Sequence, residues 1–250
     1  MHTGATGPDG IPCKSAYLFL AQGSPLPNAI TVSCLMPTFA RHHLLPRAVD
    51  MFLAQQRPGA ELLIVSEDGL PDALADRHAG VRHIPCAAGL SLGAKRNLAC
   101  EAARGGILVH WDDDDLQAAD RLARQFAAFN SGRVQVSGSS LAHFREASTG
   151  LCWEYRYRDR TRPWVCGATL AYTREYWLRH PFADVTIGED NRFVWAANAD
   201  EFHDLNDAGL CLCTIHDGNT SVKNTADAWW RLIELPARWQ GLITPADRRA

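Results

Sequence analysis

Between residues 30 and 130 the chain alternates short apolar runs with segments that repeat apolar residues at helical spacing, and this alternation limits the possible folds. The pattern predicts strands at Ile30–Met36, Glu61–Ser66, Val81–Pro85 and Ile107–Trp111, and helices at Leu45–Leu53, Gly93–Arg104 and Leu116–Phe129. Strands that alternate with helices form mostly parallel sheets covered by helices on both faces. We therefore expect an α/β fold whose ligands bind outside the carboxyl ends of the strands.

The alternation weakens after residue 130. There the pattern predicts strands at Arg133–Ser139, Trp153–Tyr157, Thr169–Tyr172 and Leu210–Ile215, and helices at Asp190–Ala197 and Thr225–Leu235. Residues 1–29 are rich in Gly, Pro and Ser and are expected to form a flexible tail. Because neither an internal repeat nor a linker interrupts residues 30–240, we expect one domain over residues 30–250.

The composition argues against several classes of protein. A formal net charge of -3 gives no electrostatic reason to expect binding to nucleic acid or to an anionic membrane. None of the eight cysteines forms a CxxC pair, and most lie in apolar runs, so a reduced, cytoplasmic protein is favoured. Since no apolar stretch approaches the length of about 18–20 residues that a membrane helix needs, no transmembrane segment is expected.

Four consecutive carboxylates, Asp112–Asp115, follow the predicted strand Ile107–Trp111 directly. Adjacent carboxylates repel one another, and a divalent cation relieves that repulsion; hard oxygen ligands suit Mg²⁺ or Mn²⁺. The alternative interpretation is a solvated acidic loop, or a helix start at which Asp115 is the capping residue. Because the preceding run is a core strand, metal binding is the favoured interpretation.

Six segments together resemble, in order, the motifs of the family 2 inverting glycosyltransferases of the GT-A fold. They are VSCLMPTFARHHLLPRAVDMFLAQ, ELLIVSEDG, SLGAKRNLACEAARGG, GGILVHWDDDDLQAADRL, TIGEDNRFVW and IHDGNTS. The fourth resembles the acidic "DxD" region, and the resemblance spans about residues 30–225. It implies a single GT-A-like domain with a mostly parallel central sheet flanked by helices, a nucleotide-binding half over residues 30–130 and an acceptor-binding half over residues 131–250.

The resemblance also implies roles for individual residues. The donor would be a nucleotide-diphosphate sugar, with UDP-sugars favoured, lying against Pro37, Thr38, Phe39, Arg41, Glu67, Asp68, Arg96, Asp112 and Asp113. Glu67 departs from the pair of aspartates usual in the family, which leaves the identity of the base open. Asn97 would hold the start of its helix.

A metal ion, Mn²⁺ or Mg²⁺, would be held by Asp112, Asp114 and His216, with Asp113 as a competitor because the register of the four-residue run is ambiguous. The other nine histidines are interpreted as surface residues. Asp190 would be the catalytic base, although two acidic residues at a helix start also complement the helix dipole. The acceptor is not specified: a glycan, a lipid-linked molecule, a peptide or a small molecule would each fit.

Two other functions remain open. A nucleotidyltransferase that makes a nucleotide-sugar would also use carboxylates and magnesium, but it usually has a glycine-rich loop after the first strand, and PTFARHH contains no glycine. A non-catalytic module that binds a nucleotide-sugar would not need Asp190. The tryptophans Trp229 and Trp230 are interpreted either as an acceptor-binding edge, since indoles stack on sugar faces, or as packing of a C-terminal helix.

Overall fold

The computed structural model describes residues 31–55, 58–71, 74, 78–159 and 161–244, so the predicted tail 1–29 lies outside the described residues. The strands are β1 Val32–Pro37, β2 Ala60–Ser66, β3 Val81–Pro85, β4 Ile107–His110, β5 Leu116–Gln117, β6 Val136–Gly138, β7 Leu141–Glu146, β8 Cys152–Arg156, β9 Ala171–Thr173, β10 Phe202–Asp204, β11 Cys211–Ile215 and β12 Trp230–Ile233. The helices are α1 Leu45–Leu53, α3 Leu92–Ala102, α4 Arg121–Ala127, α5 Arg174–Arg179, α6 Glu189–Trp195 and α7 Ala237–Gln240, with 3-10 turns η2 Ala128–Ser131 and η3 Gly167–Thr169.

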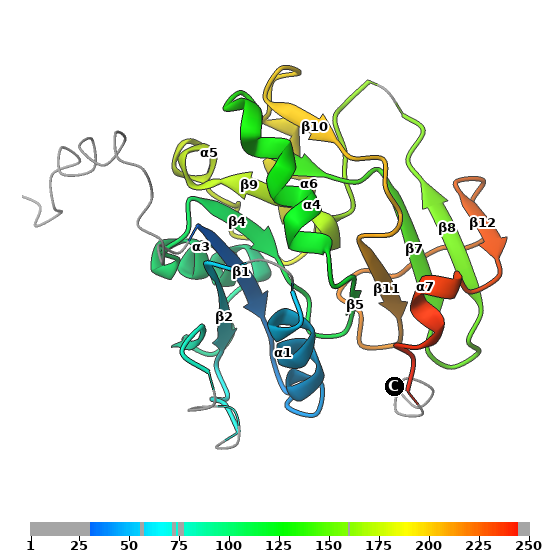
Figure 1. Ribbon diagram of the computed structural model, residues 1–250, viewed down its shortest axis with the longest axis horizontal. Helices are drawn as coiled ribbons and strands as arrows, with labels where there is room; N and C mark the ends of the chain where they lie inside the picture. Colours follow the sequence, from blue (N-terminus) through cyan, green and yellow to red (C-terminus); the bar gives the residue numbers. More distant parts are fainter. Residues whose placement is uncertain (1–30, 56–57, 72–73, 75–77, 160, 245–250) are drawn as a thin grey trace, which may run out of the picture.

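Seven strands form the central sheet in the order β10-β6-β9-β4-β1-β2-β3 (Figure 1). β1 pairs in parallel with both β2 and β4, and β3 extends the sheet beyond β2, while β9 is antiparallel to β4 and β6. The chain therefore builds outward on one side of β1 and then returns to its other side. Such a reversal of strand order opens a crevice at the carboxyl ends of the two strands concerned, here β1 and β4.

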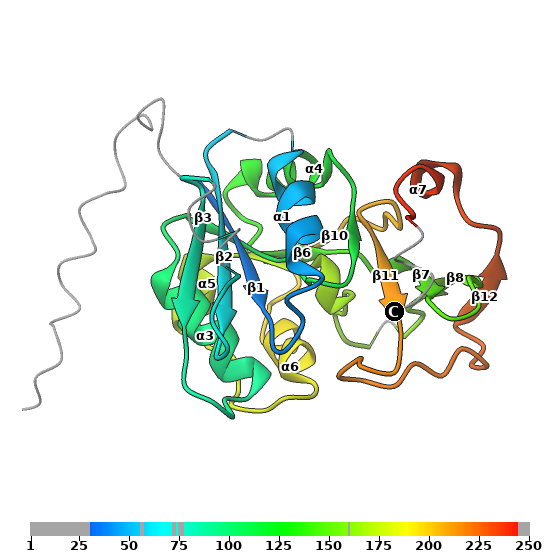
Figure 2. The same cartoon turned by 90° about the horizontal axis from the view of Figure 1, so that it is seen from below.

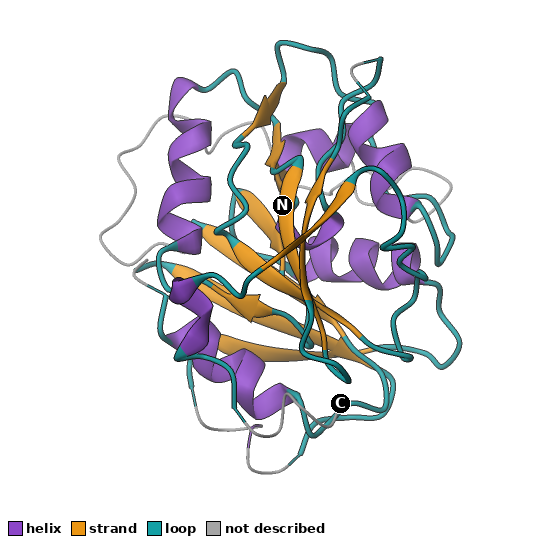
Figure 3. Cartoon of the chain, turned by 90° about the vertical axis from the view of Figure 1, so that its right-hand side faces the viewer, coloured by secondary structure: helices purple, strands orange, loops and turns teal. Residues whose placement is uncertain are grey.

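Helices cover both faces of this sheet, as the alternation predicted (Figures 2 and 3). Leu35 of β1 packs into one core with Ala99 of α3 and Phe193 of α6. Its neighbours along the strand point to the other face, where Met36 packs with Phe52 of α1. Strands that are buried on both faces read as continuous apolar runs, which is why β1 and β2 could be recognised from the sequence.

A second, five-stranded sheet, in the order β12-β8-β7-β11-β5, was not predicted. It lies beside the central sheet at the right of Figures 1 and 2. Its strands are short and come from distant parts of the chain: β5 pairs with β11, and β7 with both β8 and β11. The predicted strands Trp153–Tyr157 and Leu210–Ile215 correspond to β8 and β11, whereas β5, β7 and β12 were not predicted as strands. The single-domain organisation over residues 30–250 stays a prediction.

Two predicted helices were wrong in part. The segment Leu116–Phe129 begins as the strand β5, which pairs with β11, and becomes helical only at Arg121. The segment Thr225–Leu235 contains the strand β12, which pairs antiparallel with β8; the helix α7 follows it. In both segments, hydrogen bonding to a distant strand outweighs helical spacing of apolar residues. In the described part of the chain we find no helix with the length and apolar character needed to cross a membrane.

Candidate active site

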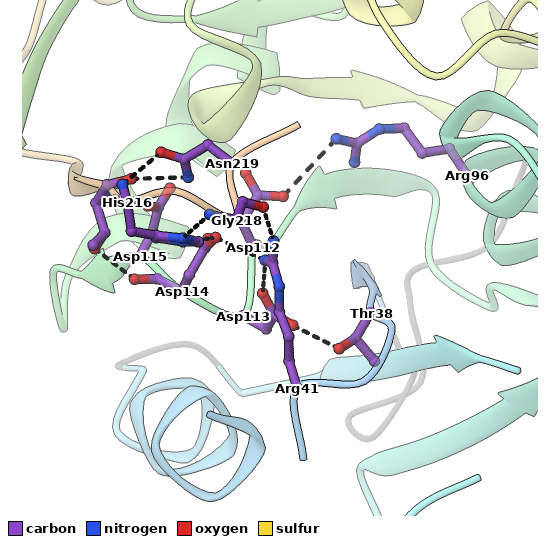
Figure 4. A network of polar contacts seen from close by, with 11 residues as sticks. Thr38, Arg41, Arg96, Asp112, Asp113, Asp114, Asp115, His216, Gly218 and Asn219 are labelled. Carbon is purple, nitrogen blue, oxygen red and sulfur yellow. Dashed lines mark hydrogen bonds and ion pairs between the residues drawn. The ribbon is translucent and has the colours of Figure 1, made fainter. Parts of the chain in front are cut away.

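The crevice between β1 and β4 brings four predicted residues into direct contact. Thr38 follows β1, and its Oγ1 donates a hydrogen bond of 2.6 Å to Oδ2 of Asp113, which follows β4. The guanidinium of Arg41 contacts Asp113 Oδ1 at 3.0 Å and Asp114 Oδ2 at 2.8 Å (Figure 4). The loop that joins Thr38 to Arg41 contains Ala40, which has a left-handed φ of 52°. The amide of Ala40 donates a hydrogen bond of 2.8 Å to Asp68 Oδ2. This loop therefore orders Arg41 over the acidic segment.

Strand β11 brings His216 to the same place. Thr214 of β11 donates its amide to Asp115 Oδ1 at 2.8 Å and its hydroxyl to the carbonyl oxygen of Asp114 at 2.6 Å. These two bonds fix the end of β11 to the acidic segment, so that His216 Nε2 lies 2.9 Å from Asp114 Oδ2 (Figure 4). Asp115 is thus an internal anchor, and the alternative interpretation of it as a helix cap is wrong, because β5 follows it and α4 begins only at Arg121.

The hydrogen bonds of His216 identify its tautomer. The amide of Gly218 donates to Nδ1 at 3.0 Å, so Nδ1 is the acceptor nitrogen. Nε2 then carries the proton that faces Asp114, and this nitrogen could bind a metal ion only after losing that proton. The backbone around the ring is held by Asn219, whose side chain accepts from the amide of His216 at 2.8 Å and donates to the carbonyl of Thr214.

The four carboxylates have different electrostatic environments. Burial raises the pKa of Asp112 and of Asp113, with the negative charge of Asp114 adding to the effect at both. Burial also raises the pKa of Asp115, well above its ordinary value. At Asp114 burial acts in the same direction, but the hydrogen bond from His216 and the charge of Arg41 outweigh it and lower the pKa. Asp114 is therefore the carboxylate of the run that is held most firmly in its ionised form.

Arg96 of α3 reaches the opposite wall of the site. Its Nε donates to Glu189 Oε1 at 3.2 Å, and its Nη2 lies 3.9 Å from Asp112 Oδ1. The side chain is buried, and Nη1 has no hydrogen-bond partner among the described residues. Asn97 does not hold the start of α3 as predicted; Ser91 caps that end, and Asn97 instead accepts from Trp177 Nε1 and the amide of Phe182.

Asp190 enters from the second residue of α6. Its carboxylate packs against Gly167: a Cβ added at Gly167 would lie 2.2 Å from Asp190 Oδ2. The carbonyl of Gly167 accepts a hydrogen bond of 3.0 Å from Nδ1 of His110, which is completely buried. The prediction that His110 lies at the surface is therefore wrong. Burial lowers its pKa well below the ordinary value, so a neutral imidazole supports the turn that touches Asp190.

Glu67 and Asp68 directly follow β2, and their carboxylates accept hydrogen bonds from other groups of the protein. Glu67 accepts from Lys95 Nζ at 3.0 Å and from the amide of Gly89 at 2.8 Å. Lys95 is buried and lies 5.3 Å from the centre of the Phe39 ring. Sequence reasoning missed Lys95; the signal was the adjacent pair Lys95-Arg96 near the start of a helix, which places two cations beside the crevice.

Three cavities meet around these side chains. One of about 210 Å³ is lined by all four carboxylates, Arg96 and Asp190, with Asn219 on its rim. A second, of about 400 Å³, lies against Pro37, Thr38, Phe39 and Lys95. A third, of about 410 Å³, shares Asp190 and Lys223 with the first, and its lining includes the aromatic residues Phe144, Tyr155, Trp164, Trp229 and Trp230. Of the predicted site residues, Glu67, Asp68 and His216 line none of these three cavities, although Gly218 and Asn219, which follow His216, line two of them.

A second group of potential metal ligands lies under the acidic segment. Asp115, Cys211 and Cys213 place their ligand atoms within 4.8 Å of one another, and all three are buried. Cys213 Sγ is 3.7 Å from Cys211 Sγ and 3.9 Å from Cys166 Sγ. This cluster joins β11 to the turn before Gly167, and the described cysteines are free thiols.

The fold of this chain resembles the folds of two solved structures. The mannosyltransferase PcManGT from Pyrobaculum calidifontis, solved with GDP-Man and Mn²⁺, matches at a TM-score of 0.57 and 18% identity over 79% of this chain and 62% of that one. TarS 1-349 of S. aureus with UDP-GlcNAc matches at 0.53 and 15%, over 76% and 60%. The chain thus spans about three fifths of the length of these neighbours. None of the curated protein sequences matches it.

The family comparison is more specific than the structural one. The family described as "Glycosyl transferase family 2" matches residues 33–184, which is more than half of the chain. The matched region begins in β1 and includes the acidic segment, although it ends before Asp190 and His216. The fold is that of the GT-A nucleotide-diphospho-sugar transferases, as the sequence predicted. The chain belongs to glycosyl transferase family 2.

Proposed function

We propose that this chain is a metal-dependent, inverting glycosyltransferase that moves a sugar from a nucleotide-diphosphate sugar to an acceptor hydroxyl. The observation that carries the proposal is the position of Asp190, which lies at the junction of two cavities. One is lined by Asp112–Asp115, the other by aromatic side chains, and Asp190 belongs to both. A carboxylate between a donor and an acceptor is where a general base is needed.

Three cationic side chains support binding of a diphosphate in the first two cavities. Arg41, Lys95 and Arg96 line them, and Nη1 of Arg96 is buried without a partner among the described residues. An unpaired buried guanidinium nitrogen is costly unless an anion meets it. Thr38 and Phe39 would flank the nucleoside. PcManGT is solved with GDP-Man and TarS 1-349 with UDP-GlcNAc, so we propose a nucleotide-sugar donor, with a UDP-sugar to be tested first.

The residues at the acidic segment fit a divalent cation. The ionised Asp114 and the imidazole of His216 meet at 2.9 Å, and Asp112 faces the same cavity. Carboxylate oxygen and imidazole nitrogen both bind Mn²⁺ or Mg²⁺. We propose Asp112, Asp114 and His216 as its holders, with Asp113 engaged by Thr38 and Arg41. When bound, such an ion neutralises the charge that develops on a departing diphosphate.

The proposed reaction is a single displacement at the anomeric carbon. Asp190 accepts the proton of the acceptor hydroxyl as its oxygen bonds to that carbon, and the bond to the diphosphate oxygen breaks. Arg96 pairs with Glu189, the neighbour of Asp190, so the donor cavity and the base are joined by one ion pair. One displacement inverts the anomeric configuration, and no side-chain nucleophile is required.

The test is release of nucleoside diphosphate from a panel of UDP-, GDP- and dTDP-sugars with Mn²⁺ and candidate acceptors. We expect turnover of one donor, loss of at least about a hundredfold in kcat for Asp190→Asn, and no change for Asp200→Asn, which alters an exposed carboxylate elsewhere. The anomeric configuration of the product is read by NMR. A retained configuration, or full activity of Asp190→Asn, would contradict the mechanism. Formation of nucleoside triphosphate and sugar 1-phosphate from the nucleotide-sugar and added pyrophosphate would favour a nucleotidyltransferase.

A further inference from the structure

One face of the second sheet carries a row of aromatic side chains. Alternation along the strands places Phe144 of β7, Tyr155 of β8 and Trp230 of β12 on the same side. The ring of Trp230 lies 4.7 Å from that of Phe144 and 4.9 Å from that of Tyr155, measured between centroids. All three rings line the third cavity, which Asp190 also lines.

Two further tryptophans complete this aromatic wall, which we define as Phe144, Tyr155, Trp164, Trp229 and Trp230. Trp164 lies 5.3 Å and Trp229 lies 6.0 Å from the ring of Tyr155. The indole nitrogen of Trp164 donates to Asn191 Oδ1 at 2.8 Å, and Asn191 follows Asp190 in α6. The wall is therefore fixed to the helix that carries the proposed base. Four of its five rings, all except Phe144, are only half-buried.

The rest of the cavity is polar. Asp190, Asn191, Lys223, Asn224 and Asp227 line it opposite or beside the wall. Its charged side chains are the ammonium of Lys223 and the carboxylates of Asp190 and Asp227, so the cavity does not favour an anionic ligand. Its volume is about 410 Å³, and it opens to solvent along the exposed Val222. A lipid chain would be held by an enclosed apolar tunnel, which this mixture of rings and hydrogen-bonding groups does not provide.

We infer that the acceptor is an uncharged carbohydrate whose sugar ring lies against the aromatic wall while one of its hydroxyls meets Asp190. Sugars combine an apolar C–H face with a rim of hydroxyls, and the cavity combines aromatic surface with amide, ammonium and carboxylate groups in the same way. The inference rests on the proposed function, because it names the acceptor class for the same site.

The test has two arms. In the first, methyl glycosides and neutral oligosaccharides are titrated into the protein without donor, and binding is followed by tryptophan fluorescence and saturation-transfer NMR. In the second, the same saccharides, a peptide panel and a lipid-linked polyprenyl phosphate are offered as acceptors with the donor. We expect saccharide binding and transfer to a saccharide hydroxyl.

Variants identify the wall as the binding surface. Trp229→Ala and the milder Trp164→Phe should raise the KM for the saccharide by about tenfold, while donor binding stays unchanged. Trp195→Ala is the matched control, because Trp195 is exposed and lies under Arg162, outside the three cavities. Transfer only to a peptide or lipid, or an unchanged KM in both wall variants, would overturn the inference. Failure of the proposed function is distinguishable, because no nucleotide-sugar would then bind at all.

Discussion

His216 Nε2 lies 2.9 Å from Asp114 Oδ2, although 102 positions separate the two residues in the sequence. The same oxygen also receives Arg41 Nη1 at 2.8 Å. A single carboxylate oxygen is therefore shared by an imidazole and a guanidinium, and the pKa of Asp114 is lowered even though burial alone would raise it. An ionised oxygen that attracts these two donors would also attract a metal ion, and Arg41 would compete with that ion for it.

That competition gives a prediction for Arg41→Ala. Removing the guanidinium frees oxygens of Asp113 and Asp114, so Mn²⁺ should bind the nucleotide-free protein several-fold more tightly (about 1 kcal/mol). Nucleotide binding should weaken, because a cation facing the diphosphate is lost. Calorimetry with MnCl₂ and with nucleotide measures both effects. Arg231→Ala is the control, since its ion pair with Glu154 is exposed and distant; weaker Mn²⁺ binding by Arg41→Ala would contradict this interpretation.

Gly167 is predicted to set the position of Asp190. A Cβ at this position would overlap Asp190 Oδ2, and the carboxylate is the group able to move. Since a misplacement of about 1 Å costs roughly a hundredfold in rate, Gly167→Ala should lower kcat by about that factor and leave nucleotide binding intact. Gly106→Ala is the matched control, because its Cβ would meet nothing within 4 Å. Equal kcat values for the two variants would rule out this role for Gly167.

Arg121 is predicted to hold the two halves of the site together. It is completely buried, and its Nη2 donates to the carbonyl oxygens of His110 at 2.8 Å and Ala168 at 2.7 Å. Arg121→Met would remove the donor that these two carbonyl oxygens and the side-chain oxygens of Gln117 and Gln125 now share. We expect a loss of about 3 kcal/mol or more in the free energy of unfolding, measured in urea. Arg133→Met, at an exposed position, should change it by less than about 0.5 kcal/mol.

Two buried thiols predict how stability depends on alkaline pH. Burial raises the pKa of Cys34 and of Cys100 to about 12, whereas an unfolded thiol ionises near about 8.5. Between these values the unfolded chain has lost a proton that the folded chain retains, so the stabilising contribution is full below about pH 8.5 and is lost as pH rises toward 12. Each thiol should lower the free energy of unfolding by about 1.4 kcal/mol per pH unit in this range.

The check is a comparison of urea unfolding at pH 8, 9 and 10 for the wild type, Cys34→Ala and Cys100→Ala. Tyrosines and lysines titrate equally in all three proteins, so only the difference in slope is interpreted. Each variant should show a shallower decline above pH 9. Parallel curves would mean that these thiols ionise in the folded protein as readily as in the unfolded one.

The sequence predicted the part of the fold that local pattern determines. The runs that became β1 and β2 are mostly apolar because both of their faces are buried, and the crevice beside them follows from strand order. β12 escaped prediction because its partner β8 lies more than seventy residues earlier, and a half-exposed edge strand carries apolar residues in no distinctive pattern.

Some residues of the candidate site could also be identified from local sequence, and others depend on distant contacts. Asp114 and Arg41 could be named because their motifs are continuous in the sequence, and His216 because it follows a strand. The anchor that brings His216 to Asp114, from Thr214 to Asp115, depends on the pairing of β5 with β11, which no local pattern announces. Glu67 and Asp68 were expected to contact the base of the nucleotide. Their carboxylates instead bind Lys95 and the backbone amides of Gly89 and Ala40.

We propose that the acidic segment and His216 form a metal-dependent nucleotide site. Its most direct test is calorimetric titration of UDP, GDP and dTDP into the purified protein with Mn²⁺ and again with EDTA, for the wild type, Asp114→Asn and the control Asp200→Asn. The account predicts binding of one nucleotide that is lost with EDTA and in Asp114→Asn and kept in Asp200→Asn. Equal binding with EDTA, or no binding of any nucleotide with Mn²⁺ present, would contradict it.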